Sequence, residues 1–239
     1  SIGNGWRQGL TYLRWDRATM RRALFIITLV LGSAPLGAQT LTAAFNNPVP
    51  GDQFLEHTSS VLYNPGPQGV DVIWDFSALN VVADTLRVWC EPDTTPYAAS
   101  FLPATLALTV AGGNWYDYYY TNNEALEYMG DAGPNHLTFY SDVMTVLKYP
   151  LSYGDDWNET CAIESDTSIS GTSVGVVMGT GSLIMPYGTV SNVVRVRLTV
   201  SIYNEYTGTT LRVYNKYYKP GVHAPLLVLD QHRPPPVWI

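Results

Sequence analysis

Residues 193–203 read Val-Val-Arg-Val-Arg-Leu-Thr-Val-Ser-Ile-Tyr, and this stretch decides the fold. Apolar residues stand at every second position, namely Val194, Val196, Leu198 and Val200. This is the period of a strand with one buried face and one wet face, so we expect the Arg195 side of the strand to face water. A second β-rich segment, 211–218, follows the Thr-Gly-Thr turn at 207–209. The two segments therefore predict a long β-hairpin.

The same short period extends outward from this hairpin over residues 39–230. Runs of β-branched and aromatic residues alternate with clusters of Gly, Pro, Asn and Asp, and we find no long segment with apolar residues at helical spacing. We expect strands at 41–45, 52–58, 70–74, 86–90, 115–121, 126–129, 137–139, 143–148, 157–163, 173–178, 181–185, 192–204, 210–218 and 226–229. The pattern predicts a single all-β domain, either an antiparallel β-sandwich or a curved half-barrel.

The composition limits the possible functions. Charged residues make up 14% of the 239 residues and hydrophobic residues 46%, which excludes an intrinsically disordered chain. The formal net charge is −7, so we expect neither nucleic acid nor an anionic membrane as a partner.

Both ends of the chain differ from this middle part. Residues 20–38 combine a basic start, Met20-Arg21-Arg22, with an apolar run at 23–32 and small residues up to Ala38, which is typical of a secretory signal peptide. Residues 1–19 precede it, and we interpret them as an upstream or non-native extension. Residues 231–239 contain three consecutive prolines and predict a Pro-rich tail or the start of a linker. We expect export through the periplasm, a secreted or cell-surface location, and no transmembrane anchor.

The two cysteines, Cys90 and Cys161, are interpreted as a structural disulfide, because an exported chain folds in an oxidising compartment. A catalytic thiol is the less favoured alternative, since neither cysteine lies in a Cys-x-x-Cys motif or next to a histidine.

Catalytic and metal-binding motifs are weak. Gly171-Thr-Ser173-Val-Gly175 matches the G-x-S-x-G nucleophile elbow, and the chain order permits a triad of Ser173, Glu205 and His223. The β-branched and Gly-rich residues that follow argue against the required helix, so we expect no catalytic residues. The histidines lack zinc-ligand spacing. An acidic cluster could hold calcium through its oxygen atoms, but a solvated loop is favoured, and we expect no metal and no cofactor. The cluster is formed by Asp155, Asp156, Glu159, Glu164 and Asp166.

The run Trp-Tyr-Asp-Tyr-Tyr-Tyr at 115–120 supplies the candidate binding residues, which are Trp115, Tyr116, Tyr118, Tyr119 and Tyr120. In a strand, residues 116, 118 and 120 share one face and residues 115, 117 and 119 the other, so aromatic rings lie on both. One face must be core. The other is either an exposed strip that stacks on sugars or a partner, or a second packed layer.

The segment 65–79, Pro-Gly-Pro-Gln-Gly-Val-Asp-Val-Ile-Trp-Asp-Phe-Ser-Ala-Leu, resembles a segment of secreted Bacteroidota proteins that often carry a C-terminal type IX secretion sorting domain. The segments 101–105, 148–157, 181–189 and 217–227 extend the resemblance. It implies a sorting domain after residue 239, so we expect either a longer natural chain or another export route. The order P-x-G-T, long hairpin, Y-x-x-G is also similar to lipoprotein-carrier-like half-barrels.

We therefore expect a non-catalytic secreted or cell-surface module that binds a glycan or a protein. The alternative is a carrier of an apolar ligand in a half-barrel, and an esterase acting through Ser173 is the third. An exposed aromatic strip would favour the module, and a large cavity lined by Val, Leu and Met would favour the carrier.

Overall fold

The computed structural model describes residues 39–58, 63–164 and 169–233. The predicted signal peptide at 20–38, the extension at 1–19 and the end of the tail at 234–239 lie outside the described residues. The strands are β1 (Gln53–Thr58), β2 (Gly69–Asp75), β3 (Ala83–Cys90), β4 (Leu106–Val110), β5 (Tyr116–Thr121), β6 (Ala125–Gly133), β7 (His136–Lys148), β8 (Asp156–Glu164), β9 (Ile169–Met185), β10 (Gly188–Asn204), β11 (Gly208–Tyr218) and β12 (Leu227–Arg233). The helical turns are α2 (Ala43–Asn46), η1 (Pro92–Thr94) and η2 (Ala98–Ser100).

All twelve strands belong to one sheet, in the order β1-β3-β4-β5-β6-β7-β8-β9-β10-β11-β12. Neighbours along this path are antiparallel, whereas β2 lies off the path and pairs in parallel with β9. The first and last strands of the path do not pair with each other, so the described sheet is open. The predicted all-β fold is confirmed, and the antiparallel pattern holds for every pair except β2 with β9.

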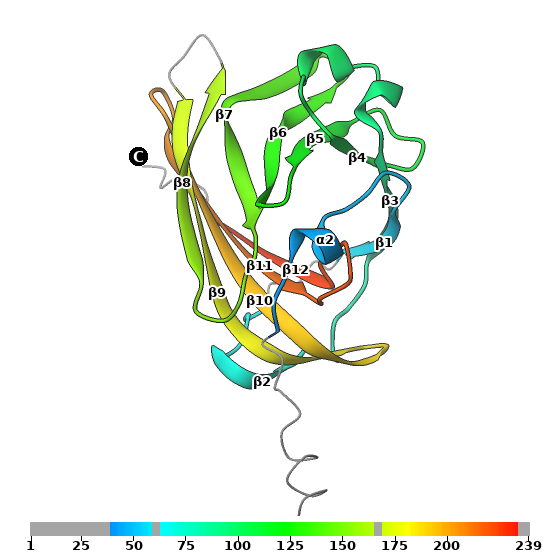
Figure 1. Cartoon of the computed structure of the whole chain (residues 1–239), viewed down its shortest axis with the longest axis vertical. Coiled ribbons are helices and arrows are strands. Elements are labelled where there is room, and N and C mark those ends of the chain that lie inside the picture. Colours follow the sequence, from blue (N-terminus) through cyan, green and yellow to red (C-terminus); the bar gives the residue numbers. More distant parts are fainter. Residues whose placement is uncertain (1–38, 59–62, 165–168, 234–239) are drawn as a thin grey trace, which may run out of the picture. The chain divides into compact units, whose positions relative to one another are not determined.

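The sheet curls so that strands far apart in its order share one core (Figure 1). We call the face that carries this core the inner face and the opposite one the outer face. Leu126 of β6 and Leu147 of β7 pack in the same buried cluster as Val196 of β10 and Tyr218 of β11. Strands on opposite sides of the curl therefore cover each other's apolar side chains, which removes them from water.

The predicted hairpin is confirmed as β10 and β11, paired from Val194 and Tyr218 to Asn204 and Gly208. The alternating residues of its first arm all lie in the inner core, each at most 6% exposed, and they are Val194, Val196, Leu198 and Val200.

The prediction that the other side of this arm faces water is wrong at Arg195, which is only 3% exposed. The loop at 65–67 returns over it, and Nη1 of Arg195 donates to the carbonyl oxygens of Pro65, Gly66 and Pro67 at 2.8, 2.8 and 3.0 Å. Tyr217 of β11 donates to the Pro65 oxygen as well, at 2.6 Å. The arginine is thus a structural anchor for the loop.

The motif at 65–79 is explained by how β2 reaches β9. Gly66 has a φ of +77°, and Trp74 donates from Nε1 to the Pro67 oxygen at 3.0 Å, which closes the loop onto the strand. A Cβ atom at Gly181 of β9 would lie 1.8 Å from the Val72 oxygen, so only glycine permits this close approach. The residues that carry the family resemblance therefore serve packing in this structure.

The strand predicted at 41–45 is wrong, because Ala43–Asn46 forms the short helix α2. The side chain of Asn46 accepts a hydrogen bond from the Thr42 amide at 3.2 Å and donates to the oxygens of Lys219 and Val222 at 3.0 and 3.1 Å. These contacts to distant residues outweigh the local β pattern. At the other end, β12 continues to Arg233, so residues 231–233 of the predicted tail belong to the sheet.

The predicted disulfide is also contradicted, because Cys90 and Cys161 are both free thiols. Cys90 on β3 packs against the outer cluster around Phe101, whereas Cys161 on β8 shares the inner face with Trp157. Four strands separate β3 from β8 in the sheet, and the two side chains leave it on opposite faces. A disulfide needs Cα atoms about 4.4–6.8 Å apart with converging Cβ vectors.

Candidate ligand-binding face

The aromatic run on β5 divides between the two faces as its alternation predicts. Tyr116, Tyr118 and Tyr120 join the outer cluster. Tyr118 is 0% exposed, its ring stacks on Phe101 with centroids 4.0 Å apart, and its hydroxyl group is hydrogen-bonded to Thr95. The segment that contains η1 and η2 therefore covers this side of β5, and the three tyrosines do not form a flat exposed strip.

The inner face of β5 carries Tyr119, which packs edge-on against Trp89 and Tyr128 at 5.1 and 5.4 Å between centroids. Burial raises its pKa well above the usual value, with further contributions from Asp117, Tyr218 and Tyr214. Tyr214 and Tyr218 of β11 are close enough to Tyr119 to contribute to its pKa shift. Strand β5 therefore faces β11 across the inner side of the curl.

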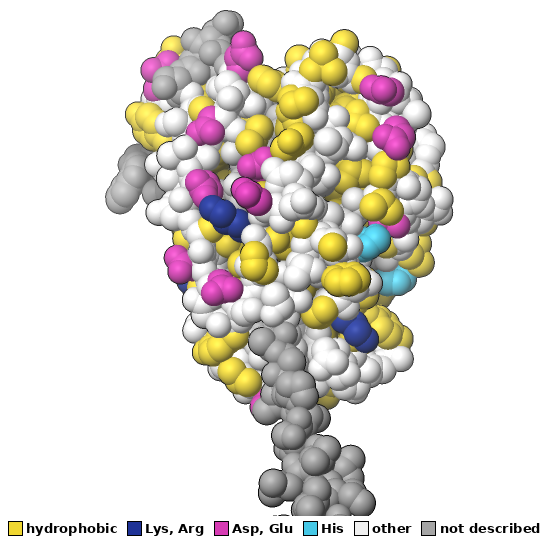
Figure 2. Space-filling model, viewed as in Figure 1, with side chains coloured by type: hydrophobic (Ala, Val, Ile, Leu, Met, Phe, Trp, Pro, Cys, Tyr) yellow, Lys and Arg dark blue, Asp and Glu magenta, His cyan; other side chains and the backbone are white. Residues whose placement is uncertain are grey.

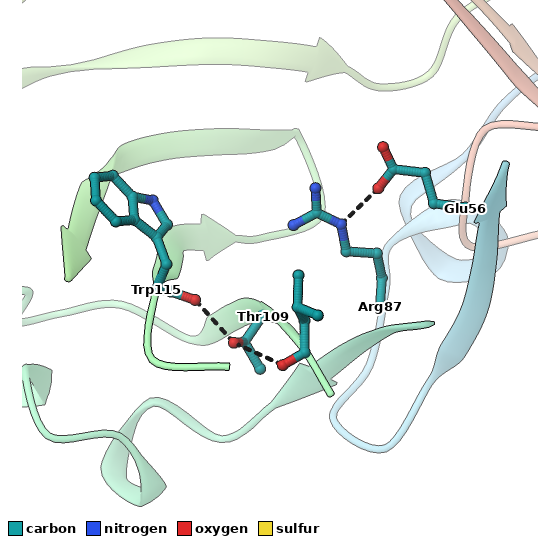
Figure 3. Close-up of polar contacts among 5 residues, drawn as sticks. Glu56, Arg87, Thr109 and Trp115 are labelled. Carbon is teal, nitrogen blue, oxygen red and sulfur yellow. Dashed lines mark hydrogen bonds and ion pairs between the residues drawn. The ribbon is translucent and has the colours of Figure 1, made fainter. Parts of the chain in front are cut away.

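Trp115 stands just before β5 and is the most exposed of the five candidate binding residues, at 44%. Its ring stacks on His136 with centroids 4.6 Å apart, and it lies directly over Gly133, where a Cβ atom would come within 2.4 Å. The oxygen of Trp115 is 2.8 Å from Oγ1 of Thr109, a contact drawn in Figure 3, which ties this residue to β4. The Trp115 ring is therefore fixed in position by its neighbours and remains partly exposed to solvent.

Two carboxylates oppose each other on the inner face, since Asp117 of β5 and Asp131 of β6 are register partners. Tyr128 donates to Asp131 at 2.8 Å, and His136 lies 2.9 Å from its other oxygen. Burial raises the pKa of Asp117 to about 6, and the charge of Asp131 adds to the shift. Asp117 therefore keeps its proton to a higher pH than an exposed aspartate does.

Arg87 of β3 partly offsets this effect on Asp117. Its Nε atom is 2.5 Å from Oε2 of Glu56 on β1, and Figure 3 shows the two side chains reaching toward each other from neighbouring strands. The arginine is therefore already paired within the protein.

Lys216 lies on the inner face of β11 between Tyr214 and Tyr218. Its Nζ atom is 5.7 Å from the centroid of the Tyr214 ring, and among the described residues it takes part in no hydrogen bond or ion pair. Burial alone lowers its pKa to about 8. Asp230, the next inner-face carboxylate on β12, acts on Arg212 instead.

Two shallow depressions lie elsewhere, on either side of Tyr149 and Pro150, with volumes of about 230 and 370 Å³. The first is lined by Thr42, Ala43, Ala44, Asn123, Tyr149 and Pro150. Neither depression contains any of the candidate binding residues. On the face drawn in Figure 2, hydrophobic side chains are spread among polar ones.

The esterase alternative lacks its geometry. Gly171 to Gly175 lie inside the continuous strand β9, so no strand-to-helix turn is formed there. Ser173 is 0% exposed and its hydroxyl has no hydrogen-bond partner among the described residues, whereas His223 is 2.6 Å from Asp52. Glu205 follows the end of β10 in the hairpin turn.

The acidic cluster is partly used within the protein. Glu159 pairs with Lys148 at 2.6 Å, and Asp155 accepts from the Ser152 amide at 2.7 Å. In the described part of the chain, no three His, Cys, Asp or Glu side chains are grouped so as to hold a metal ion. Asp166 lies outside that part.

Sequence reasoning missed Lys216, Arg87 and the pairing of Asp117 with Asp131. Asp117 is recognisable in the sequence as the only acid in the aromatic run. Its partner Asp131 is identified only by the β5–β6 register. Lys216 was visible between tyrosines, but its burial follows from the curl of the sheet.

Comparisons with models of protein families, with curated proteins and with solved structures found no match to this chain. The resemblance to secreted Bacteroidota proteins stays a prediction. Within the described residues, no helix has the length and apolar character needed to cross a membrane.

Proposed function

We propose that the protein is an exported, non-catalytic β module that binds a small apolar ligand against the inner face of its curled sheet, as a half-barrel carrier would. Tyr119, Tyr214 and Lys216 support this proposal together. All three keep part of their surface accessible to solvent, although burial shifts the pKa of Tyr119 and Lys216 strongly. These three side chains therefore present surface on the inner face that a ligand can reach.

The chemistry of this lining suits an apolar molecule. Aromatic rings of Trp89, Tyr119 and Tyr128 are in contact with one another on the inner face, and Leu106 is the register partner of Tyr119. Ligand sites are mostly apolar and aromatic surfaces with a few polar groups that fix orientation.

A bulky side chain introduced on the inner face tests the proposal. Val228 of β12 is opposite Lys216 and 43% exposed, so Val228→Trp should lower the affinity for the neutral dye Nile red at least tenfold. Leu86→Trp is the matched control, because Leu86 is 41% exposed and lies on the same outer face of β3 as Cys90. Equal dye binding by the natural chain and both variants, all folded, would reject the inner face as the site.

A second candidate function is binding of a glycan or protein through Trp115, the expectation favoured by the sequence. This candidate is supported by the position of the Trp115 indole ring, which stacks on His136 while the residue is 44% exposed. Trp115→Ala should abolish retention on a glycan array or partner, while Tyr153→Ala, at a tyrosine 48% exposed, should not. Unchanged retention in Trp115→Ala would remove this candidate.

A further inference from the structure

We infer that Lys216 binds the carboxylate of an apolar, fatty-acid-like ligand, with the hydroxyl groups of Tyr119 and Tyr218 as further donors. This inference rests on the proposed function and names the class of ligand. It goes beyond an apolar lining because it assigns a charge to the ligand and a position to its head group.

The first argument is the missing counter-charge. A desolvated ammonium group is costly unless it is paired, and Lys216 has three donors and no acceptor among the described residues. Its contact with the Tyr214 ring, at 5.7 Å, is a cation–π interaction that leaves those donors free. An anion that binds on the inner face would supply the missing partner.

The second argument is the surrounding hydroxyl groups. Tyr218 is two residues along the same face of β11, and Tyr119 faces β11 from β5. Burial raises the pKa of both, so both keep their protons at neutral pH and can donate. Neither hydroxyl group is hydrogen-bonded to a described residue. One cation and two neutral donors match the two oxygens of a carboxylate.

The third argument concerns the size of the charge. Arg87 on this face is already paired with Glu56, Arg212 lies beside Tyr214 and Asp230, and no charged group is found to act on Lys216. The single charge of Lys216 suits a monoanion better than a phosphate dianion. The register partner of Lys216 is the apolar Val228, and Tyr119 packs on Trp89, so an apolar chain beyond the carboxylate has aromatic and aliphatic surface beside it.

The test compares dodecanoic acid with dodecanol, which share the chain and differ in the head group, by calorimetric titration of the full chain. We expect the acid to bind at least tenfold more tightly than the alcohol. Lys216→Met should remove that difference without weakening the alcohol, and Lys216→Arg should keep part of it. Met has a similar length and no charge, so this variant is expected to fold. Lys148→Met, at a lysine paired with Glu159, is the control and should change neither ligand.

Three outcomes overturn the inference. If acid and alcohol bind equally and Lys216→Met changes neither, the head group is not recognised, while the proposed function stands. If the acid is preferred and Lys216→Met leaves that preference intact, the carboxylate is held elsewhere. If neither compound binds the natural chain and Nile red does not bind either, the proposed function fails together with the inference.

Discussion

The two faces of the β10–β11 hairpin carry one cation each, Arg195 buried and Lys216 partly buried, and the two cations have opposite surroundings. Arg195 on the outer face donates to three carbonyl oxygens of the loop at 65–67. Lys216 on the inner face has no acceptor among the described residues. The comparison teaches that burial alone does not distinguish a structural cation from a binding one. The distinction lies in whether the protein itself supplies the acceptors.

The largest expected effect is on the outer face. Arg195→Met leaves the oxygens of Pro65, Gly66 and Pro67 without their donor, so the free energy of unfolding should fall by about 3–5 kcal/mol. Urea unfolding measures the loss. Arg197→Met, two residues along the same strand at a partly exposed position, is the control and should cost less than about 1 kcal/mol. Similar losses for both arginines would mean that the loop contacts contribute little.

The second effect concerns the inner face, where Asp117 has a raised pKa of about 6 instead of 3.8. Between these values the unfolded chain loses the proton of Asp117 and the folded chain keeps it. The stability that this group contributes is therefore complete below about pH 3.8 and is lost as the pH rises through about 6. The loss is at most about 3 kcal/mol, since one pKa unit corresponds to about 1.4 kcal/mol.

Asp117→Asn should remove this part of the pH dependence, measured by urea unfolding at several pH values. Asp131, Glu56 and Arg87 act on Asp117 and remain in the variant, so the difference between the two curves isolates Asp117. Asp71→Asn is the control, because Asp71 is exposed. Parallel curves for the natural chain and Asp117→Asn would show that Asp117 ionises normally.

The third effect compares two neighbouring tyrosines of β5 on opposite faces. The Tyr118 hydroxyl is buried and hydrogen-bonded to Thr95, so Tyr118→Phe should cost about 1–2 kcal/mol. The Tyr119 hydroxyl has no partner among the described residues, so Tyr119→Phe should cost less than about 0.5 kcal/mol. Thermal and urea unfolding of both variants measure the contrast. A loss at Tyr119 as large as that at Tyr118 would mean that its hydroxyl is used by the fold.

These contrasts also explain what the sequence could predict. The hairpin was predictable because the period of two lies within one segment, and β5 divides its aromatic residues as alternation requires. The prediction failed for Arg195, because the covering loop comes from residues 65–67, far away in the sequence. It failed for the disulfide because the oxidising compartment says nothing about the faces on which Cys90 and Cys161 lie.

Two further differences concern the strands themselves. The strand β4, Leu106–Val110, was missed although Pro103 precedes it and Gly112-Gly113 follows it. The strands β7 and β9 were each predicted as two pieces, since Ser141-Asp142 and Gly179-Thr180 resemble breaks. In the sheet, pairing on both sides holds β9 extended through its glycines. The candidate site could not be predicted from the sequence, because it depends on the β5–β6 register and on the curl that brings β5 opposite β11.

The smallest expected effect returns to Lys216. The natural chain without ligand holds an ammonium group with a pKa lowered to about 8 by burial, and no described acceptor compensates for the lost water. Lys216→Met removes the charge and keeps the length of the side chain. The free energy of unfolding at pH 7 should therefore stay within about 0.5 kcal/mol or rise by up to about 1 kcal/mol, as replacements of buried charges by apolar residues do. Urea unfolding of the ligand-free chain measures it, beside Arg195→Met as the contrasting buried cation. A loss of several kcal/mol in Lys216→Met would mean that the folded protein already pairs this lysine, and the contrast between the two faces of the hairpin would then disappear.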